Sequence, residues 1–170
     1  MDSKTILRKK AKELRKFLDI ELLSNNLIKQ IRQQDYYNGA KNVLLFYPLR
    51  YEYNFLDLLN DGKNFFLPKV NGNDLYICPF KLGDKLQLST LNIKEPCSNP
   101  VDPDCLDLII VPALFVDKHN YRLGYGGGFY DRFLAKYPKV TTVVPIARQM
   151  VIDSIPKEDF DVKIDYVLTT

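Results

Sequence analysis

Residues 122–131, Arg-Leu-Gly-Tyr-Gly-Gly-Gly-Phe-Tyr-Asp, are the stretch whose residue types and spacing best suit chemistry. Four of the chain's eight glycines lie here, so the backbone can adopt positive φ and approach a ligand closely, while Arg122 and Asp131 retain charge at the two ends. A buried apolar run precedes the stretch and a helical pattern begins at Phe129, and N–H groups at a helix start attract phosphate. The stretch therefore predicts a phosphate cradle, with a tight turn that merely needs glycine as the alternative.

The glycine spacing excludes two familiar nucleotide motifs. There is no G-x-x-x-x-G-K-[ST] segment, and Gly124, Gly126, Gly127 and Gly128 do not follow the G-x-G-x-x-G pattern of a dinucleotide site. A phosphate cradle at this place must therefore belong to another class of nucleotide site.

Basic residues near the N-terminus form a second candidate group. Lys4, Arg8 and Lys12 recur at i, i+4 spacing on a helix predicted over residues 3–18, with Ser3 as its N-cap. They predict either a clamp on phosphate or carboxylate, or a solvated basic face. The apolar residues of this helix are expected to face the core: Leu7, Ala11, Leu14 and Leu18.

Asp131 and Asp165 are the candidate magnesium ligands, since Mg²⁺ prefers carboxylate and phosphate oxygens and often takes only one or two protein ligands. Each could equally cap a helix or end a strand. His119 is the only histidine, so neither a histidine metal cluster nor a histidine-activated nucleophile is expected, and covalent catalysis is not indicated.

Aromatic residues surround both the glycine-rich stretch and the loop near Glu52. They suit stacking against a flat heteroaromatic ligand, with ordinary packing as the alternative. They are Tyr47, Tyr51, Tyr53, Tyr125, Phe129 and Tyr130.

Periodicity places these groups on an alternation of helices and strands. Helices are predicted at 3–18, 20–35, 55–59 and 129–137, and strands at 43–47, 65–67, 75–79, 106–111, 140–146 and 166–168. The turn signal at 71–74 indicates one antiparallel pair, and residues 81–105 are expected to be irregular. We predict a three-layer α/β/α domain with a largely parallel sheet and ligands at the carboxyl ends of its strands.

Composition limits the class of protein. The 170 residues suit one domain, residues 1–170, and no apolar run approaches the roughly 20 residues that span a bilayer. The three cysteines, Cys78, Cys97 and Cys105, show no C-x-x-C spacing and are expected to be free thiols. No signal peptide is evident, and we expect a cytoplasmic monomer.

Several segments together, in order along nearly the whole chain, resemble the 5-formyltetrahydrofolate cyclo-ligase family, also called methenyltetrahydrofolate synthetases. Its opening K-x-x-x-R matches Lys4 and Arg8, and its acidic segment after the first strand matches Glu52 and residues 53–55. The remaining matches are Pro68-Lys69, Glu95-Pro96, 107–112, 115–119, 122–131 and Lys163-Ile164-Asp165. Two segments depart from the family pattern, Tyr53-Asn54-Phe55 and Ala147-Arg148, and they put the details of the substrate pocket in question.

The resemblance implies an enzyme that uses ATP and Mg²⁺ to close 5-formyltetrahydrofolate to 5,10-methenyltetrahydrofolate, with release of ADP and phosphate through a phosphorylated formyl intermediate. It implies that Lys4, Arg8 and Arg122 neutralise phosphate charge, and that Asp131 with Asp165 positions magnesium. It also implies that residues 124–130 (Gly124, Tyr125, Gly126, Gly127, Gly128, Phe129, Tyr130) bind ATP and that Glu52 binds the pterin, with Tyr47, Tyr125 and Tyr130 against the folate.

Two other functions are consistent with the residues. The two departures from the family pattern would suit a catalytically idle relative that binds folate or nucleotide. The basic N-terminal helix would suit a nucleic-acid-associated protein whose affinity falls steeply with salt, although the net charge of +3 is small.

Overall fold

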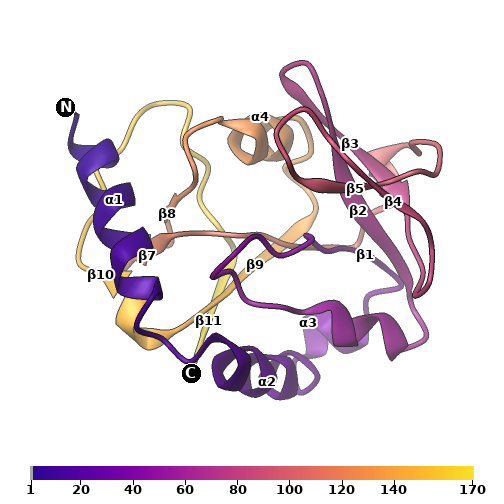
Figure 1. The fold of residues 1–170 in the computed structure, drawn as a ribbon, viewed down its shortest axis with the longest axis horizontal. Coiled ribbons are helices and arrows are strands. Elements are labelled where there is room, and N and C mark those ends of the chain that lie inside the picture. Colours follow the sequence, from indigo (N-terminus) through magenta and orange to yellow (C-terminus); the bar gives the residue numbers. More distant parts are fainter. Residues whose placement is uncertain (1) are drawn as a thin grey trace.

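A six-stranded sheet with helices on both faces forms the centre of the molecule in a computed structural model, which describes residues 2–170 (Figure 1). The strand order is β11-β9-β6-β1-β2-β3, and all neighbours are parallel except β2 and β3. The strands are β1 (Asn42–Leu44), β2 (Asn64–Asn71), β3 (Asp74–Pro79), β6 (Leu108–Ile110), β9 (Thr141–Ile146) and β11 (Tyr166–Thr169). The predicted α/β class, with a largely parallel sheet and one antiparallel pair, is confirmed.

The central strands are short and almost wholly apolar. Val43 and Leu44 of β1, and all three residues of β6, are buried, because helices and loops cover both faces and a parallel strand in that position has no solvated side. The carboxyl ends of β1 and β6 therefore lie side by side, and the loops that leave them begin at one edge of the sheet.

Four helices flank the sheet. In Figure 1, α2 (Ile20–Ile31) and α3 (Asp35–Asn38) lie below the sheet, whereas α4 (Phe129–Lys136) lies above it beside β3, and α1 (Ser3–Arg15) stands at one end. Asp2, not the predicted Ser3, caps α1: its carboxylate accepts a hydrogen bond from the backbone N–H of Thr5 at 2.9 Å. Within residues 2–170, no helix has both the length and the apolar character needed to cross a lipid bilayer.

Two small sheets were not predicted from the sequence. A three-stranded sheet, in the order β10-β7-β8, is built from segments of two or three residues, and a hairpin of two strands lies within the supposedly irregular region 81–105. Strands this short show no readable alternation. The three-stranded sheet consists of β7 (Phe115–Asp117), β8 (Arg122–Leu123) and β10 (Val151–Ile152), and the hairpin consists of β4 (Leu86–Leu88) and β5 (Lys94–Pro96). The described residues also form the short 3-10 helices η1 (Leu56–Asn60), η2 (Pro103–Cys105) and η3 (Arg148–Met150).

The inward face of helix α1 is shifted from the predicted one: Leu7, Ala11 and Leu18 pack in or against the core as predicted, but Leu14 does not. Leu14 is 39% exposed, whereas Arg15 is only 2% exposed and Ala11 is fully buried. Successive residues are rotated by about 100° around a helix, so Lys4, Arg8, Ala11 and Arg15 share one face and Leu14 falls outside it. The inward face of α1 is therefore cationic, and the prediction that Leu14 packs in the core is wrong.

Candidate active site

A cavity of about 630 Å³ opens at the carboxyl-end edge of the sheet. Its wall is formed by the loop after β1, the β2–β3 hairpin, the β4–β5 hairpin, the loop after β6, the glycine-rich segment after β8, the N-terminal part of α1 and residues 158–161. Ligand sites in α/β sheets usually lie at this edge, where the connections leave the strands in different directions. Seven segments of the described chain thus meet around one volume.

The glycine-rich loop has the positive-φ glycines of a tight turn, and it also lines the cavity, where the predicted phosphate cradle would lie. Gly126 and Gly128 have φ of 109° and 70°, a region that side chains rarely adopt, and Gly128 is the N-cap of α4. A Cβ atom on Gly124 would lie 2.8 Å from Nη1 of Arg122, so glycine is also required there for close approach. The loop therefore brings bare backbone to the cavity wall next to the N-terminus of a helix.

Three cationic side chains line this part of the cavity: Lys4, Arg8 and Arg122. Arg8 donates from Nε to the carbonyl oxygen of Gly124 at 2.9 Å, which ties α1 to the glycine-rich loop. Arg122 is 9% exposed, donates from Nη1 to the Pro112 carbonyl oxygen at 2.8 Å, and lies 5.3 Å from the ring centroid of Tyr130. Burial lowers the pKa of Arg122, whereas Asp131 and Tyr130 act in the opposite direction. Its Nε has no hydrogen-bond partner within residues 2–170.

Several carboxylates line the cavity near these cations, among them Asp131, Asp161 and Glu158, whose Oε2 lies 3.9 Å from Nζ of Lys4. Asp131, in the first turn of α4, accepts a hydrogen bond at Oδ1 from the backbone N–H of Val162 at 3.3 Å. Asp161 pairs through Oδ2 with Nζ of Lys4 at 2.7 Å, and both aspartates line the cavity. Among the described residues, Oδ2 of Asp131 and Oδ1 of Asp161 accept no hydrogen bond, so each carboxylate has one oxygen available.

Asp165 does not join this group. Its Oδ2 accepts hydrogen bonds from the backbone N–H and the hydroxyl of Thr142 at 2.9 and 3.2 Å, and its own N–H donates to that hydroxyl. Thr142 lies near the start of β9, at the amino ends of the parallel strands, whereas the cavity lies at the carboxyl ends. The structure therefore does not bring Asp165 to Asp131, and it places Asp161 in the cavity instead.

Glu52 lies on the other side of the cavity and is 6% exposed. Its Oε1 accepts a hydrogen bond from the Leu49 N–H at 2.7 Å. Burial raises the pKa of Glu52, while the Leu49 N–H, the charge of Arg15 and the hydroxyl of Tyr125 act to lower it. The residue before it, Tyr51, has a φ of 65°, a strained conformation for a side chain of this size that turns the loop back toward the cavity.

Aromatic rings lie between the cations and Glu52. Tyr47, Tyr125, Phe129 and Tyr130 all line the cavity, and Lys94 of the β4–β5 hairpin places Nζ 5.4 Å from the ring centroid of Tyr47. Burial is the largest influence on both Tyr125 and Tyr130 and raises the pKa of each hydroxyl, which therefore stays neutral near pH 7. The cavity thus has a cationic, glycine-lined part and an aromatic part that contains the buried carboxylate of Glu52, and a second buried carboxylate, Glu95, lies on the β4–β5 hairpin.

Comparison with known proteins identifies the family. A sequence model of the 5-formyltetrahydrofolate cyclo-ligase family matches residues 1–170. The chain belongs to this family. A cyclo-ligase of Mus musculus is 26% identical over 161 residues, with 84% of this chain and 79% of the relative covered, and that of Mycoplasma genitalium is 26% identical over 128 residues, with 75% and 72% covered.

The fold agrees with this family. The NMR structure of 5,10-methenyltetrahydrofolate synthetase from Aquifex aeolicus superimposes with a TM-score of 0.84 and 30% sequence identity, covering 98% of this chain and 89% of that chain. The resemblance drawn from the motifs is therefore confirmed, and with it the assignment of the chain to a family of ligases.

Asp161 and Arg15 were missed from the sequence, and Glu95 matched a family motif but had no predicted role. Asp161 lies four residues before the predicted Asp165, and nothing in the sequence separates the two. Arg15 lies seven residues after Arg8, a spacing that returns it to the same helix face. Glu95 of the hairpin is 5% exposed and accepts at Oε2 from the N–H of Val70 at 2.9 Å, which holds the hairpin over the cavity.

Replacing Gly124 with Ala is expected to weaken ATP binding about tenfold or more. The added Cβ would displace the buried Arg122 guanidinium, and overpacking of this kind costs about 1–3 kcal/mol. Calorimetric titration of ATP would measure the effect. Gly62→Ala is the control for a substitution away from the cavity, because a Cβ there meets nothing within 4 Å, although the φ of 70° at Gly62 adds a backbone strain that Gly124 does not have. Equal ATP affinity in the Gly124→Ala variant and the native protein would show that the position of Arg122 does not matter for nucleotide.

Proposed function

We propose that the protein catalyses the ATP- and Mg²⁺-dependent closure of 5-formyltetrahydrofolate to 5,10-methenyltetrahydrofolate, with release of ADP and phosphate. The observation that carries this proposal is the single cavity in which phosphate-binding groups and a buried carboxylate ringed by aromatic side chains face each other. Membership of the cyclo-ligase family supports the same reaction.

The cationic half of the cavity suits the triphosphate of ATP. Lys4, Arg8 and Arg122 supply positive charge, and residues 124–128 supply backbone amides without side chains in the way. Arg122 is already fixed by Pro112 and Tyr130, so little side-chain entropy is lost when it binds phosphate. Phe129 and Tyr130 begin the helix that follows this loop and complete the nucleotide wall.

Asp131 and Asp161 fit a magnesium ion. No cluster of three or more metal-binding side chains exists within residues 2–170, but Mg²⁺ commonly uses one or two carboxylates and completes its shell with water and phosphate oxygens. When bound, the ion would neutralise charge on the β- and γ-phosphates. The two aspartates keep a free oxygen each for this purpose, whereas the carboxylate of Asp165 is used by Thr142.

The aromatic half suits the folate. The carboxylate of Glu52 can accept paired hydrogen bonds from the amino-pyrimidinone edge of a pterin, and Tyr47, Tyr125 and Tyr130 can pack against flat rings. With the pterin at Glu52, the formyl group would point toward the phosphate half of the cavity. This arrangement places the two reacting groups within one enclosed volume.

The chemistry requires positioning more than a protein nucleophile. The formyl oxygen attacks the γ-phosphorus of ATP and the bond to ADP breaks, which turns a poor leaving group into phosphate. The neighbouring folate nitrogen then attacks the formyl carbon and loses its proton, and phosphate leaves with the formyl oxygen to give the methenyl cation. Lys4, Arg8 and Arg122 stabilise the charge that develops on the transferred phosphoryl group.

We also propose that residues 1–170 form one catalytic domain, because segments from near both ends of the chain line the same cavity. That the protein acts as a monomer stays a prediction, which the molar mass in solution would test.

The test is incubation of the protein with 5-formyltetrahydrofolate, ATP and Mg²⁺ while methenyltetrahydrofolate is followed by its near-ultraviolet absorbance. Product that depends on all three components, with ADP formed in equal amount, is the expected result. Folded protein that binds both substrates but yields no product would be an idle relative, and protein that binds neither would reject the proposal altogether.

A further inference from the structure

Arg15 is a buried cation that the reaction described above does not use. It is 2% exposed, although most arginines keep their guanidinium in water. Nη1 donates to the hydroxyl of Tyr125 at 3.0 Å, Nη2 donates to the carbonyl oxygen of Ala113, and the guanidinium carbon lies 5.2 Å from the ring centroid of Tyr53. Its Nε has no partner among residues 2–170.

These contacts fix the guanidinium without neutralising it. No carboxylate of the described residues lies within 4 Å of Arg15 in an ion pair, so its charge is uncompensated at close range. The hydroxyl of Tyr125, which accepts from Arg15 at 3.0 Å, lines the same cavity as Glu52, and the charge of Arg15 acts to lower the pKa of the Glu52 carboxyl. The charge of Arg15, which is costly to bury, thus acts on the buried carboxylate of Glu52.

We propose that Arg15 is a positioning residue that keeps the Glu52 carboxylate ionised and oriented for its ligand, through its charge and through the hydroxyl of Tyr125. The proposal rests on the proposed function in so far as the ligand of Glu52 is the pterin. Since Lys4 and Arg8 lie on the same face of α1, one helix would then serve both substrates: its first two turns bind phosphate and its last turn controls the acid that binds folate.

Three side chains act on the charge of Glu52. Arg15 comes from α1, Tyr125 from the glycine-rich loop and Tyr130 from α4, and the Leu49 N–H completes the set. Burial raises the pKa of Glu52, and both tyrosines remain neutral near pH 7, so Arg15 is the only cation of this set. Removal of its charge should therefore raise the pKa of Glu52. As the pH is lowered, the carboxylate would then be protonated earlier, and binding that needs the ionised carboxylate would be lost at a higher pH than in the native protein.

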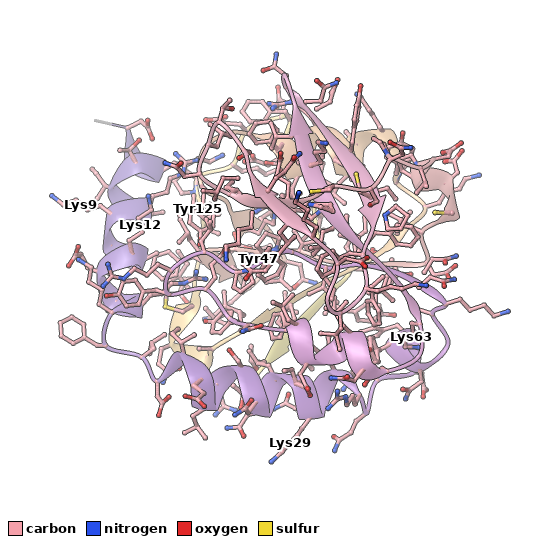
Figure 2. The ribbon with its side chains drawn as sticks, turned by 45° about the vertical axis from the view of Figure 1, so that its right-hand side comes forward. Lys9, Lys12, Lys29, Tyr47, Lys63 and Tyr125 are labelled. Atoms are coloured by element: carbon pink, nitrogen blue, oxygen red, sulfur yellow. The ribbon has the colours of Figure 1, made fainter. Side chains whose placement is uncertain are left out.

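The experiment compares Arg15→Gln, which removes the charge but keeps an amide donor, with Arg15→Lys, which keeps the charge but loses the planar fork. The titration of Glu52 is followed by NMR of ¹³C-carboxyl glutamate in the ligand-free protein, so that the readout does not depend on turnover. Lys9→Gln is the matched control, because Lys9 is exposed on the same helix and points away from the molecule in Figure 2.

We expect the pKa of Glu52 to rise in Arg15→Gln, and to stay near the native value in Arg15→Lys and Lys9→Gln. The KM for 5-formyltetrahydrofolate should rise about tenfold in Arg15→Gln, the effect of weakening one charge-assisted hydrogen bond, while the KM for ATP changes little. A purely structural role would instead lower the thermal midpoint and leave the titration of Glu52 unchanged. That result would overturn the proposal.

The outcomes separate this inference from the proposed function. If the native protein yields no product, the reaction is rejected, but the titration of Glu52 still tests Arg15. If the native protein is active and Arg15→Gln leaves both the titration and the KM unchanged, Arg15 alone is rejected. Should Arg15→Gln fail to fold, Tyr125→Phe removes the hydroxyl from the same chain of contacts and should also raise the pKa of Glu52; no change there would overturn the proposal.

Discussion

Replacing Asp131 with Asn is expected to lower kcat about 100- to 1000-fold while the protein stays folded. Asp131 is half-buried in the first turn of α4, lines the cavity, and makes only one hydrogen bond among the described residues, to the Val162 N–H at 3.3 Å. Asparagine can still accept that bond, so the fold should tolerate the change. What is lost is the negative charge that would hold Mg²⁺ beside the phosphates, and loss of one preorganised group at a reacting centre typically has an effect of about this size.

Two measurements show whether the loss reflects metal binding. The Mg²⁺ concentration for half-maximal rate should rise in Asp131→Asn, and it should rise in Asp161→Asn as well, because both carboxylates face the cavity. Thermal unfolding without ligand should hardly change in Asp131→Asn. Native turnover and native Mg²⁺ dependence in Asp131→Asn would remove this residue from the metal site.

Asp165→Asn is the informative comparison. Its carboxylate joins the start of β9 to the residue before β11 through Thr142, so its replacement should cost about 1 kcal/mol of folding stability and lower the thermal midpoint by a few degrees. Its kcat should stay near that of the native protein. A fall in kcat as large as that of Asp131→Asn would restore Asp165 as the metal ligand and reject Asp161.

This pair of aspartates shows where sequence reasoning reaches its limit. The glycine-rich stretch, the cations Lys4, Arg8 and Arg122, and Glu52 could be assigned to one site because the segments that carry them match the family pattern in order along the chain. Asp161 and Asp165 are both acidic residues in the same connection before β11, and only the path of that connection decides which one faces the cavity. Spacing along an irregular segment carries no such information, whereas spacing along a helix or strand does.

Helix α1 gives a second example with a different cause. Leu7, Ala11 and Leu18 pack in or against the core as their spacing predicted. At the last turn, however, the guanidinium of Arg15 donates to Tyr125 and Ala113, and Leu14 is left exposed. Tertiary surroundings thus overrode the hydrophobic pattern at Leu14 alone. The six main strands, by contrast, were predicted correctly because buried parallel strands produce continuous apolar runs that few other elements produce at that length.

Glu52→Gln should weaken the binding of 5-formyltetrahydrofolate about 10- to 100-fold and leave ATP binding near its native value. Glutamine has almost the same shape and can still accept from the Leu49 N–H, which holds the side chain in place. It cannot accept both hydrogen bonds that an amino-pyrimidinone edge donates to a carboxylate, because an NH₂ donor replaces one of the two oxygens. Hydrogen bonds to a charged group contribute about 1.5–3 kcal/mol, which corresponds to the expected loss of affinity.

Separate titrations of the two substrates measure this effect, with folate binding followed by calorimetry in the absence of ATP. Glu95→Gln is the matched control, since Glu95 is also a buried carboxylate at the cavity, and its Oε2 accepts from the Val70 N–H as Oε1 of Glu52 accepts from the Leu49 N–H. If Glu52→Gln binds folate as the native protein does, the pterin lies elsewhere in the cavity. If it weakens ATP and folate equally, Glu52 supports the shape of the whole cavity instead of one substrate. Only the selective loss of folate agrees with a buried acid that is kept ionised to bind the pterin.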